Sequence, residues 1–301
     1  MQGSNEAIKT SAGGAVTLPA PQDSSARHEV AACPTCRSRS GSQVQSFVFA
    51  LGSVDPRFPS SSVEKEYAQV VGRADSGGLA NRELLYSILT RPENRYLPRQ
   101  LCWVFRIEGL DTYLLQPRDV NDFDKLVEAI RPPQNRNLAD VDVVIGQRGP
   151  VAPPELCNGL QVPIVVFATL DSLDRTALVQ RVKKPNRVAA REFTAATDQL
   201  LLRIAQMADN AGDTDEYRAL NYCAVRRPEM YENDNRLSGE DFSLSKVEAR
   251  PSRLSGRRKI VDVVLSYSHR KTDFTEKYYW RVDVTEEFPF LVSGIAPYYD
   301  R

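Results

Sequence analysis

Histidine is almost absent from this sequence, and most familiar catalytic arrangements are absent with it. Only His28 and His269 occur among the 301 residues, so neither a Ser-His-Asp triad nor a Cys-His pair is indicated. Phosphate-binding loops, dinucleotide-binding glycine motifs and zinc-protease motifs are also missing. The sequence therefore shows no recognisable catalytic set and no protease triad. Enzymatic activity is left open, and a non-catalytic role is favoured.

An excess of one charge and a long apolar run are missing as well. Lys plus Arg and Asp plus Glu both number 39, so no bulk charge predicts a nucleic-acid or anionic membrane partner. The apolar run VPIVVFATL is far shorter than the roughly 20 residues that a membrane helix needs. The first residues lack the basic and apolar regions of a signal peptide. We expect a cytoplasmic protein with neither nucleic-acid nor membrane partners.

Hydrophobic residues make up 42% of the chain, which suffices for a core, and their periodicity predicts an α+β fold in two consecutive domains. Residues 1–44 contain few large apolar side chains and are expected to form a flexible leader or linker. Residues 45–168 alternate strands and helices and include a β-hairpin whose turn contains Gly109. Residues 169–301 predict helices followed by an antiparallel β-meander. We expect one of these helices to end at Gly212 and the next to run through residues 214–231.

Several long segments of residues 45–301 are similar to a known family. They include FALGSVDPRFPSSSVEKEYAQ, DVDVVIGQRGPVAPPELCNGLQVPIVVF, EARPSRLSGRRKIVDVVLSYS and PYYDR. Together they resemble the C-terminal region of cyanobactin maturation proteases of the PatA and PatG type. The resemblance implies two consecutive units and a link to ribosomally made, modified peptides. It does not imply cleavage or macrocyclisation, because the subtilisin-like protease domain of that family has no counterpart in this sequence.

Five cysteines without a secretory signal are typical of a reducing compartment, where a CxxC pair is more often metal-binding or redox-active than a structural disulfide. Cys33 and Cys36 have the spacing of half a zinc site, and tetrahedral zinc needs two further ligands. Cys102 and Cys157 are the candidates, and the family resemblance supports a four-cysteine zinc site. The alternatives are a redox CxxC and two ordinary buried cysteines. Cys223, on the apolar stripe of a predicted helix, is expected in the core.

A basic turn is the main candidate for ligand binding. ARPSRLSGRRK places five cations near a hairpin turn, and guanidinium groups bind carboxylates or phosphates in a bidentate manner. The predicted peptide- or anion-binding residues are Arg250, Arg253, Arg257, Arg258 and Lys259. A merely solvated turn is the simpler alternative.

Two further polar groups allow both structural and functional interpretations. Arg57 in DPRFP could contact a peptide together with neighbouring aromatic residues, or pair with Asp55. Asp140 and Asp142 alternate at the start of a strand, where an exposed strand end is a simpler interpretation than acid–base chemistry.

The leading hypothesis is a non-catalytic accessory or interaction protein of ribosomal peptide maturation, of the cyanobactin type. It would contain a structural zinc and dock a precursor peptide or another maturation enzyme. One alternative is a peptide-maturation enzyme with unrecognised catalytic residues. Another is a dimerisation module that pairs two copies through the meander and the aromatic segment EKYYWRV.

Overall fold

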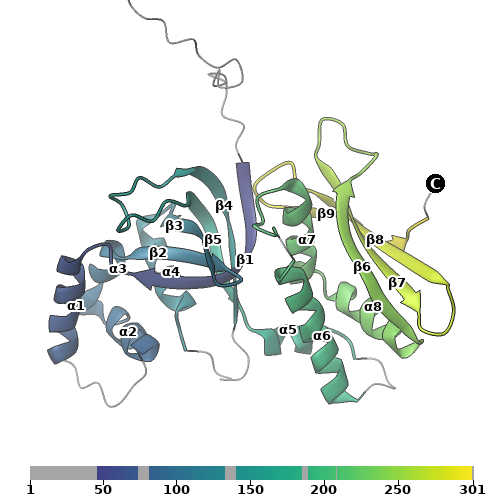
Figure 1. Cartoon of the computed structure of the whole chain (residues 1–301), viewed down its shortest axis with the longest axis horizontal. Coiled ribbons are helices and arrows are strands. Elements are labelled where there is room, and N and C mark those ends of the chain that lie inside the picture. Colours follow the sequence, from purple (N-terminus) through teal and green to yellow (C-terminus); the bar gives the residue numbers. More distant parts are fainter. Residues whose placement is uncertain (1–45, 74–80, 133–139, 185–188, 208, 300–301) are drawn as a thin grey trace, which may run out of the picture. The chain divides into compact units, whose positions relative to one another are not determined.

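A computed structural model describes residues 46–73, 81–132, 140–184, 189–207 and 209–299. The predicted leader and its CxxC pair therefore lie outside the described residues. Residues 45–301 form one compact unit. Within it, the structure combines helices with two sheets, which confirms the α+β class (Figure 1).

The first sheet is a closed five-stranded barrel with the strand order β1-β2-β3-β5-β4. Its strands are β1 (Ser46–Arg57), β2 (Cys102–Ile107), β3 (Leu110–Pro117), β4 (Val141–Val151) and β5 (Pro163–Leu173). Neighbours are antiparallel except for the parallel pair β3–β5. The predicted hairpin is β2–β3, and its turn residues Glu108 and Gly109 both have positive φ, as a tight hairpin turn requires. The boundary expected at residue 168 falls within β5.

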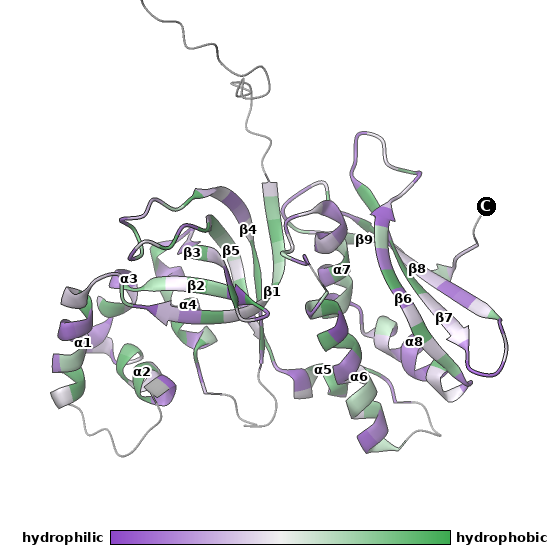
Figure 2. Cartoon of the chain, in the orientation of Figure 1, coloured by the Kyte–Doolittle hydropathy of each residue, from purple (hydrophilic) through white to green (hydrophobic). Residues whose placement is uncertain are grey.

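Short helices in the first half pack against the barrel. They are α1 (Ser61–Arg73), α2 (Asn81–Leu89), η2 (Pro92–Asn94), α3 (Leu97–Gln100), η3 (Val120–Asp122) and α4 (Phe123–Ala129). Their apolar side chains pack with inward-facing barrel residues such as Val48, Trp103 and Phe167 into one core cluster. In Figure 2, apolar residues follow strand β1.

The second half begins with four helices, α5 (Arg175–Arg181), α6 (Ala190–Ala205), α7 (Asp215–Arg226) and α8 (Pro228–Gly239). Asp174 and Thr214 cap α5 and α7, since their side chains accept hydrogen bonds from backbone N–H groups of the first turn. The expectation of one helix over 214–231 was wrong, because Pro228 cannot continue the helical hydrogen bonds and forces Arg227 out of the helical conformation. The preceding helix also ends earlier than expected, at Ala205.

The second sheet is the predicted antiparallel meander. Its strands β6 (Phe242–Pro251), β7 (Ile260–His269), β8 (Thr275–Asp283) and β9 (Phe290–Pro297) pair in sequence order. Helices α7 and α8 contact β6, and α7 also contacts β7 and β8. Residues Val261, Val263 and Leu265 of β7 are buried in the core on this face, whereas alternate residues of the strand point to the opposite, outer face.

Helix α7 is joined to strand β1 of the barrel by buried polar contacts. The Asn221 side chain donates to the carbonyl of Phe49 (2.8 Å), and the Phe49 N–H donates to the carbonyl of Gly212 (2.8 Å). Phe49 and Leu51 also belong to the core cluster that contains α7 and the meander. The alternation of β1 therefore places residues of one strand in two cores.

None of the described helices combines the length and the apolarity that crossing a bilayer requires.

Candidate functional site

The outer face of the meander carries a row of charges that runs across three strands. Arg250 on β6 is in register with Asp262 on β7, and Asp262 is in register with Arg281 on β8. Arg281 Nε donates to Asp262 Oδ1 (2.8 Å), and this hydrogen bond raises the pKa of Arg281. Arg250 lies near Glu248 of its own strand, with 3.7 Å between Nη1 and Oε1. The register of the strands thus holds two guanidinium groups on either side of one carboxylate.

Tyrosine rings lie beneath both guanidinium groups. The Cζ atom of Arg250 lies 4.4 Å from the ring centroid of Tyr298, and that of Arg281 lies 5.1 Å from the ring centroid of Tyr279. These distances are within the range of cation–π attraction. The rings restrict the arginines, so less side-chain entropy is lost when a ligand binds them.

These side chains border a hollow of about 440 Å³. Arg253 and Tyr299 complete its basic and aromatic lining. Among the described residues, its lining contains three guanidinium groups and one carboxylate, that of Asp262, so the net charge of this lining is positive. Such a surface suits an extended ligand that carries carboxylates, because arginine binds carboxylates in a bidentate manner and flat tyrosine rings contact peptide groups. We call it the basic hollow.

The structure separates the five cations predicted from the basic turn. Arg250 and Arg253 line the basic hollow, whereas Arg257 is exposed in the turn between β6 and β7. Arg258 pairs with the buried carboxylate of Asp283 and lies over the ring of Phe290. Lys259 pairs with Asp215 at the start of α7 (3.0 Å).

Sequence reasoning missed Arg281, Tyr279 and Tyr298 as members of this site. They come from the segment EKYYWRV and from the residues after β9, far in sequence from the turn. The strict alternation of β8 was the available signal, because it places Tyr279 and Arg281 on the face opposite Trp280, which is buried in the core. Only the pairing of β8 with β7 brings Arg281 beside Asp262.

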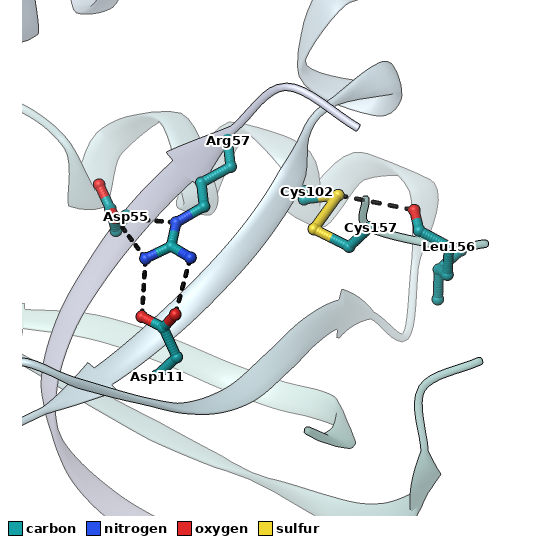
Figure 3. Close-up of a disulfide and its surroundings, with 6 residues drawn as sticks. All are labelled: Asp55, Arg57, Cys102, Asp111, Leu156 and Cys157. Atoms are coloured by element: carbon teal, nitrogen blue, oxygen red, sulfur yellow. Dashed lines mark hydrogen bonds and ion pairs between the residues drawn. A yellow bond between two sulfur atoms is a disulfide. The ribbon is translucent and has the colours of Figure 1, made fainter. Parts of the chain in front are cut away.

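Two of the four predicted zinc cysteines lie together. Cys102 at the start of β2 and Cys157 in the loop before β5 are joined by a disulfide, with Cα atoms 5.9 Å apart (Figure 3). Both are buried, and the carbonyl oxygen of Leu156 lies 3.6 Å from Cys102 Sγ. Among the described residues no group of three or more His, Cys, Asp or Glu side chains is arranged to hold a metal. Cys33 and Cys36 belong to the part of the chain that is not described, and Cys223 is buried in the core.

Arg57 is held by structural ion pairs. Its guanidinium donates two hydrogen bonds of 2.7 Å to Asp111 on β3 and also contacts Asp55 of its own strand (Figure 3). The hydrogen bonds to Asp111 raise the pKa of Arg57. The pairing alternative considered for this residue is therefore confirmed.

The interpretation of Asp142 as part of an exposed strand end was wrong, because this residue lies in the interior and is only 3% exposed. Its carboxylate accepts hydrogen bonds from the backbone N–H of Val54 (2.8 Å) and the hydroxyl of Ser172 (2.6 Å). Burial raises its pKa to about 6, although both hydrogen bonds oppose this shift. These partners are structural, since they join β4 to its two neighbouring strands.

The comparisons with known proteins agree with the sequence resemblance. Residues 187–298 match the family model described as PatG C-terminal. The chain contains a PatG-type C-terminal region. This region includes α6, α7, α8 and the whole meander, and therefore most of the basic hollow. No curated protein sequence matches the chain.

The PatG likeness extends through the barrel at the level of fold. A solved structure described as "PatG Domain of Unknown Function" is similar, with a TM-score of 0.68 and 18% sequence identity. The match covers 84% of this chain and 98% of that one. It shows that the barrel, the helices and the meander together have the fold of that PatG domain.

Proposed function

We propose that this chain is a non-catalytic accessory protein of ribosomal peptide maturation, of the cyanobactin type. Its task would be to dock an acidic segment of a precursor peptide or of a partner maturation enzyme. The PatG-type C-terminal region supports the setting, and the basic hollow on the meander supports the docking role. The basic hollow is the observation that carries the proposal, because it combines positive charge with flat aromatic surface.

The charge balance of the hollow decides which peptide it suits. Arg281 is paired with Asp262 and Arg250 lies near Glu248, and Arg253 adds a third guanidinium to the lining. An acidic segment gains charge-assisted contacts with these guanidinium groups and stacks on Tyr298 and Tyr299. A neutral or basic segment would gain only the stacking. Binding should therefore weaken as salt screens the exposed guanidinium groups.

Charge reversal at two residues of the same turn tests this proposal. Arg253→Glu alters the hollow, and Arg257→Glu makes the same change at an exposed residue outside its lining. Fluorescence anisotropy would compare a labelled peptide rich in Glu with its Gln counterpart. We expect Arg253→Glu to weaken binding of the Glu peptide about tenfold or more and Arg257→Glu to change it little. Equal effects of the two variants, or equal binding of the two peptides, would contradict the proposal.

We also propose a structural zinc held by Cys33, Cys36, Cys102 and Cys157. The proximity of Cys102 and Cys157 supports it, because both sulfurs are buried at one place and zinc could bind them as thiolates. The ion would supply a cross-link between the segment carrying Cys33 and the barrel. It requires the reduced form of the Cys102–Cys157 pair, since a disulfide offers no thiolate.

Metal content and thiol content together test the zinc. Protein purified under reducing conditions would be measured by elemental mass spectrometry, as wild type and as the double variants Cys33→Ser/Cys36→Ser and Cys102→Ser/Cys157→Ser. One zinc per chain that both variants lose supports the site. Metal-free wild-type protein, or zinc retained in either variant, would contradict the four-cysteine site.

A further inference from the structure

A second cavity lies on the inner side of the meander, where α6 and α8 meet strands β6 and β7. Its volume is about 270 Å³, which is below the roughly 300–1,000 Å³ of pockets for drug-sized ligands. Residues from all four elements line it, among them Gln199 of α6, Asp234 of α8, Leu244 of β6 and Tyr267 of β7. We call it the inner pocket. The size of this cavity limits its occupant to a small molecule.

The Tyr267 hydroxyl is a buried polar group of the inner pocket. Tyr267 is 1% exposed, and its hydroxyl makes no hydrogen bond of good geometry within the described part of the chain, although the Asp234 carboxylate and the Asn233 side chain lie near it. Burial of unpaired polar groups costs free energy, and native proteins normally satisfy them. A ligand with hydrogen-bonding groups would do so here.

Asp234 gives the floor a carboxylate. Burial raises its pKa to about 6, against the opposing effects of the nearby Tyr267 hydroxyl and the Arg203 guanidinium. At neutral pH the carboxylate is therefore mostly ionised inside a partly desolvated site. This arrangement favours an incoming group that is positively charged and donates hydrogen bonds, such as an ammonium.

The rim of the inner pocket carries positive charge, opposite to that of the Asp234 carboxylate. Arg203 and Arg270 are exposed and line the mouth of the pocket. Arg203 donates hydrogen bonds to the carbonyls of Leu244 (3.0 Å) and Ser245 (3.4 Å), which holds its guanidinium beside the opening. A purely cationic ligand would be repelled by this rim, and a purely anionic one would meet the Asp234 carboxylate. A ligand with both charges meets neither obstacle.

Apolar side chains form the remaining walls. They belong to Ala196, Leu200, Phe242 and Leu244. They provide a surface for an aliphatic group of a few carbons.

We propose that the inner pocket binds a free α-amino acid with an aliphatic side chain. Its ammonium group lies toward Asp234 and Tyr267, and its carboxylate lies toward Arg203 and Arg270. Its side chain packs against Leu200 and Phe242. This small-molecule site is separate from the basic hollow and does not depend on the proposed docking role.

Isothermal titration calorimetry with leucine and two analogues tests the proposal. 4-Methylpentanoate keeps the side chain and carboxylate of leucine but lacks the amine, and isopentylamine lacks the carboxylate. We expect leucine to bind at least about tenfold more tightly than either analogue, because each analogue leaves one charged group of the site without a partner. Absence of leucine binding, or equal binding of all three compounds, would overturn the proposal.

Variants of the floor show whether the heat comes from this pocket. Asp234→Asn and Tyr267→Phe should each weaken leucine binding, the former by about tenfold or more. Asp124→Asn makes the same chemical change as Asp234→Asn at an exposed residue of α4 and should leave binding unchanged. Tyr267→Phe should also remain folded, since the hydroxyl it removes makes no hydrogen bond of good geometry in the described residues. Unaltered leucine binding in both floor variants would overturn the assignment.

Discussion

Replacement of Asp142 by asparagine should remove a pH dependence that burial imposes on the barrel. Burial raises the pKa of this carboxyl from the ordinary 3.8 to about 6. At 1.36 kcal/mol per pKa unit, the difference corresponds to about 3 kcal/mol. The folded state binds the proton more tightly than the unfolded state, so protonation of Asp142 stabilises the protein. This stabilisation is complete below about pH 4 and is lost as the pH rises to about 6.

The asparagine variant keeps the geometry without the charge. Its side-chain oxygen can accept from the Val54 N–H, and its amide can donate to the Ser172 hydroxyl, whose proton is free to rotate. Urea denaturation at several pH values between 4 and 7 gives the free energy of unfolding of both proteins. We expect the wild type to lose about 2.4 kcal/mol relative to Asp142→Asn across this range.

Controls separate the charge from the hydrogen bonds. Asp124→Asn, at an exposed residue, should run parallel to the wild type at every pH. Asp142→Ala leaves the buried Val54 N–H without its acceptor and should be about 1–3 kcal/mol less stable than Asp142→Asn. Parallel curves for the wild type and Asp142→Asn would refute the reasoning, because they would mean that Asp142 has an ordinary pKa in the folded protein.

Three further substitutions test how α7 and the loop before it are held. Gly212→Ala should lower the free energy of unfolding by more than about 2 kcal/mol, because Gly212 has φ +71° and a Cβ would lie 2.2 Å from the Phe49 carbonyl oxygen. Gly239→Ala is the control and should lower it little, because there is open space around Gly239. Thermal denaturation compares the two variants. Asn221→Ala should lower the free energy of unfolding in urea by about 2 kcal/mol, since buried carbonyl and amide groups lose their partner. Arg218→Met should cost about 3 kcal/mol in the same assay, because this buried guanidinium donates to three backbone carbonyls. A loss below about 1 kcal/mol in either urea experiment would contradict the structural role assigned there.

The sequence predicted turns and strand faces well, because these depend on interactions between residues close together in the sequence. The turn EGLD places Gly109 where positive φ is needed, and the alternation in IVDVVLSYSH gives β7 its two faces. The break before Pro228 was also readable, because proline cannot occupy a helix interior. It was overlooked since the apolar periodicity continues on both sides of it.

The sequence did not predict features that depend on the pairing of strands far apart in the sequence. Closure of the barrel depends on β1 pairing with β4 and on the parallel contact of β3 with β5, and no short sequence pattern encodes either. Asp142 was expected at an exposed strand end because it alternates with Asp140, but closure of the barrel buries it between Val54 and Ser172. In the same way the basic turn was visible as a sequence cluster, whereas the neighbours that form the hollow come from other strands.

Strand β7 explains how one meander offers two chemically different surfaces. Asp262 and Tyr267 are five positions apart along the strand, so their side chains point to opposite faces. The face of Asp262 carries the wider basic hollow, which suits an extended peptide. The face of Tyr267 is covered by α6 and α8 and forms the smaller inner pocket, which an extended peptide cannot enter. The alternation of side chains along β7 and the position of the helices on one face therefore give the same sheet a site for a peptide on one face and a site for a small molecule on the other.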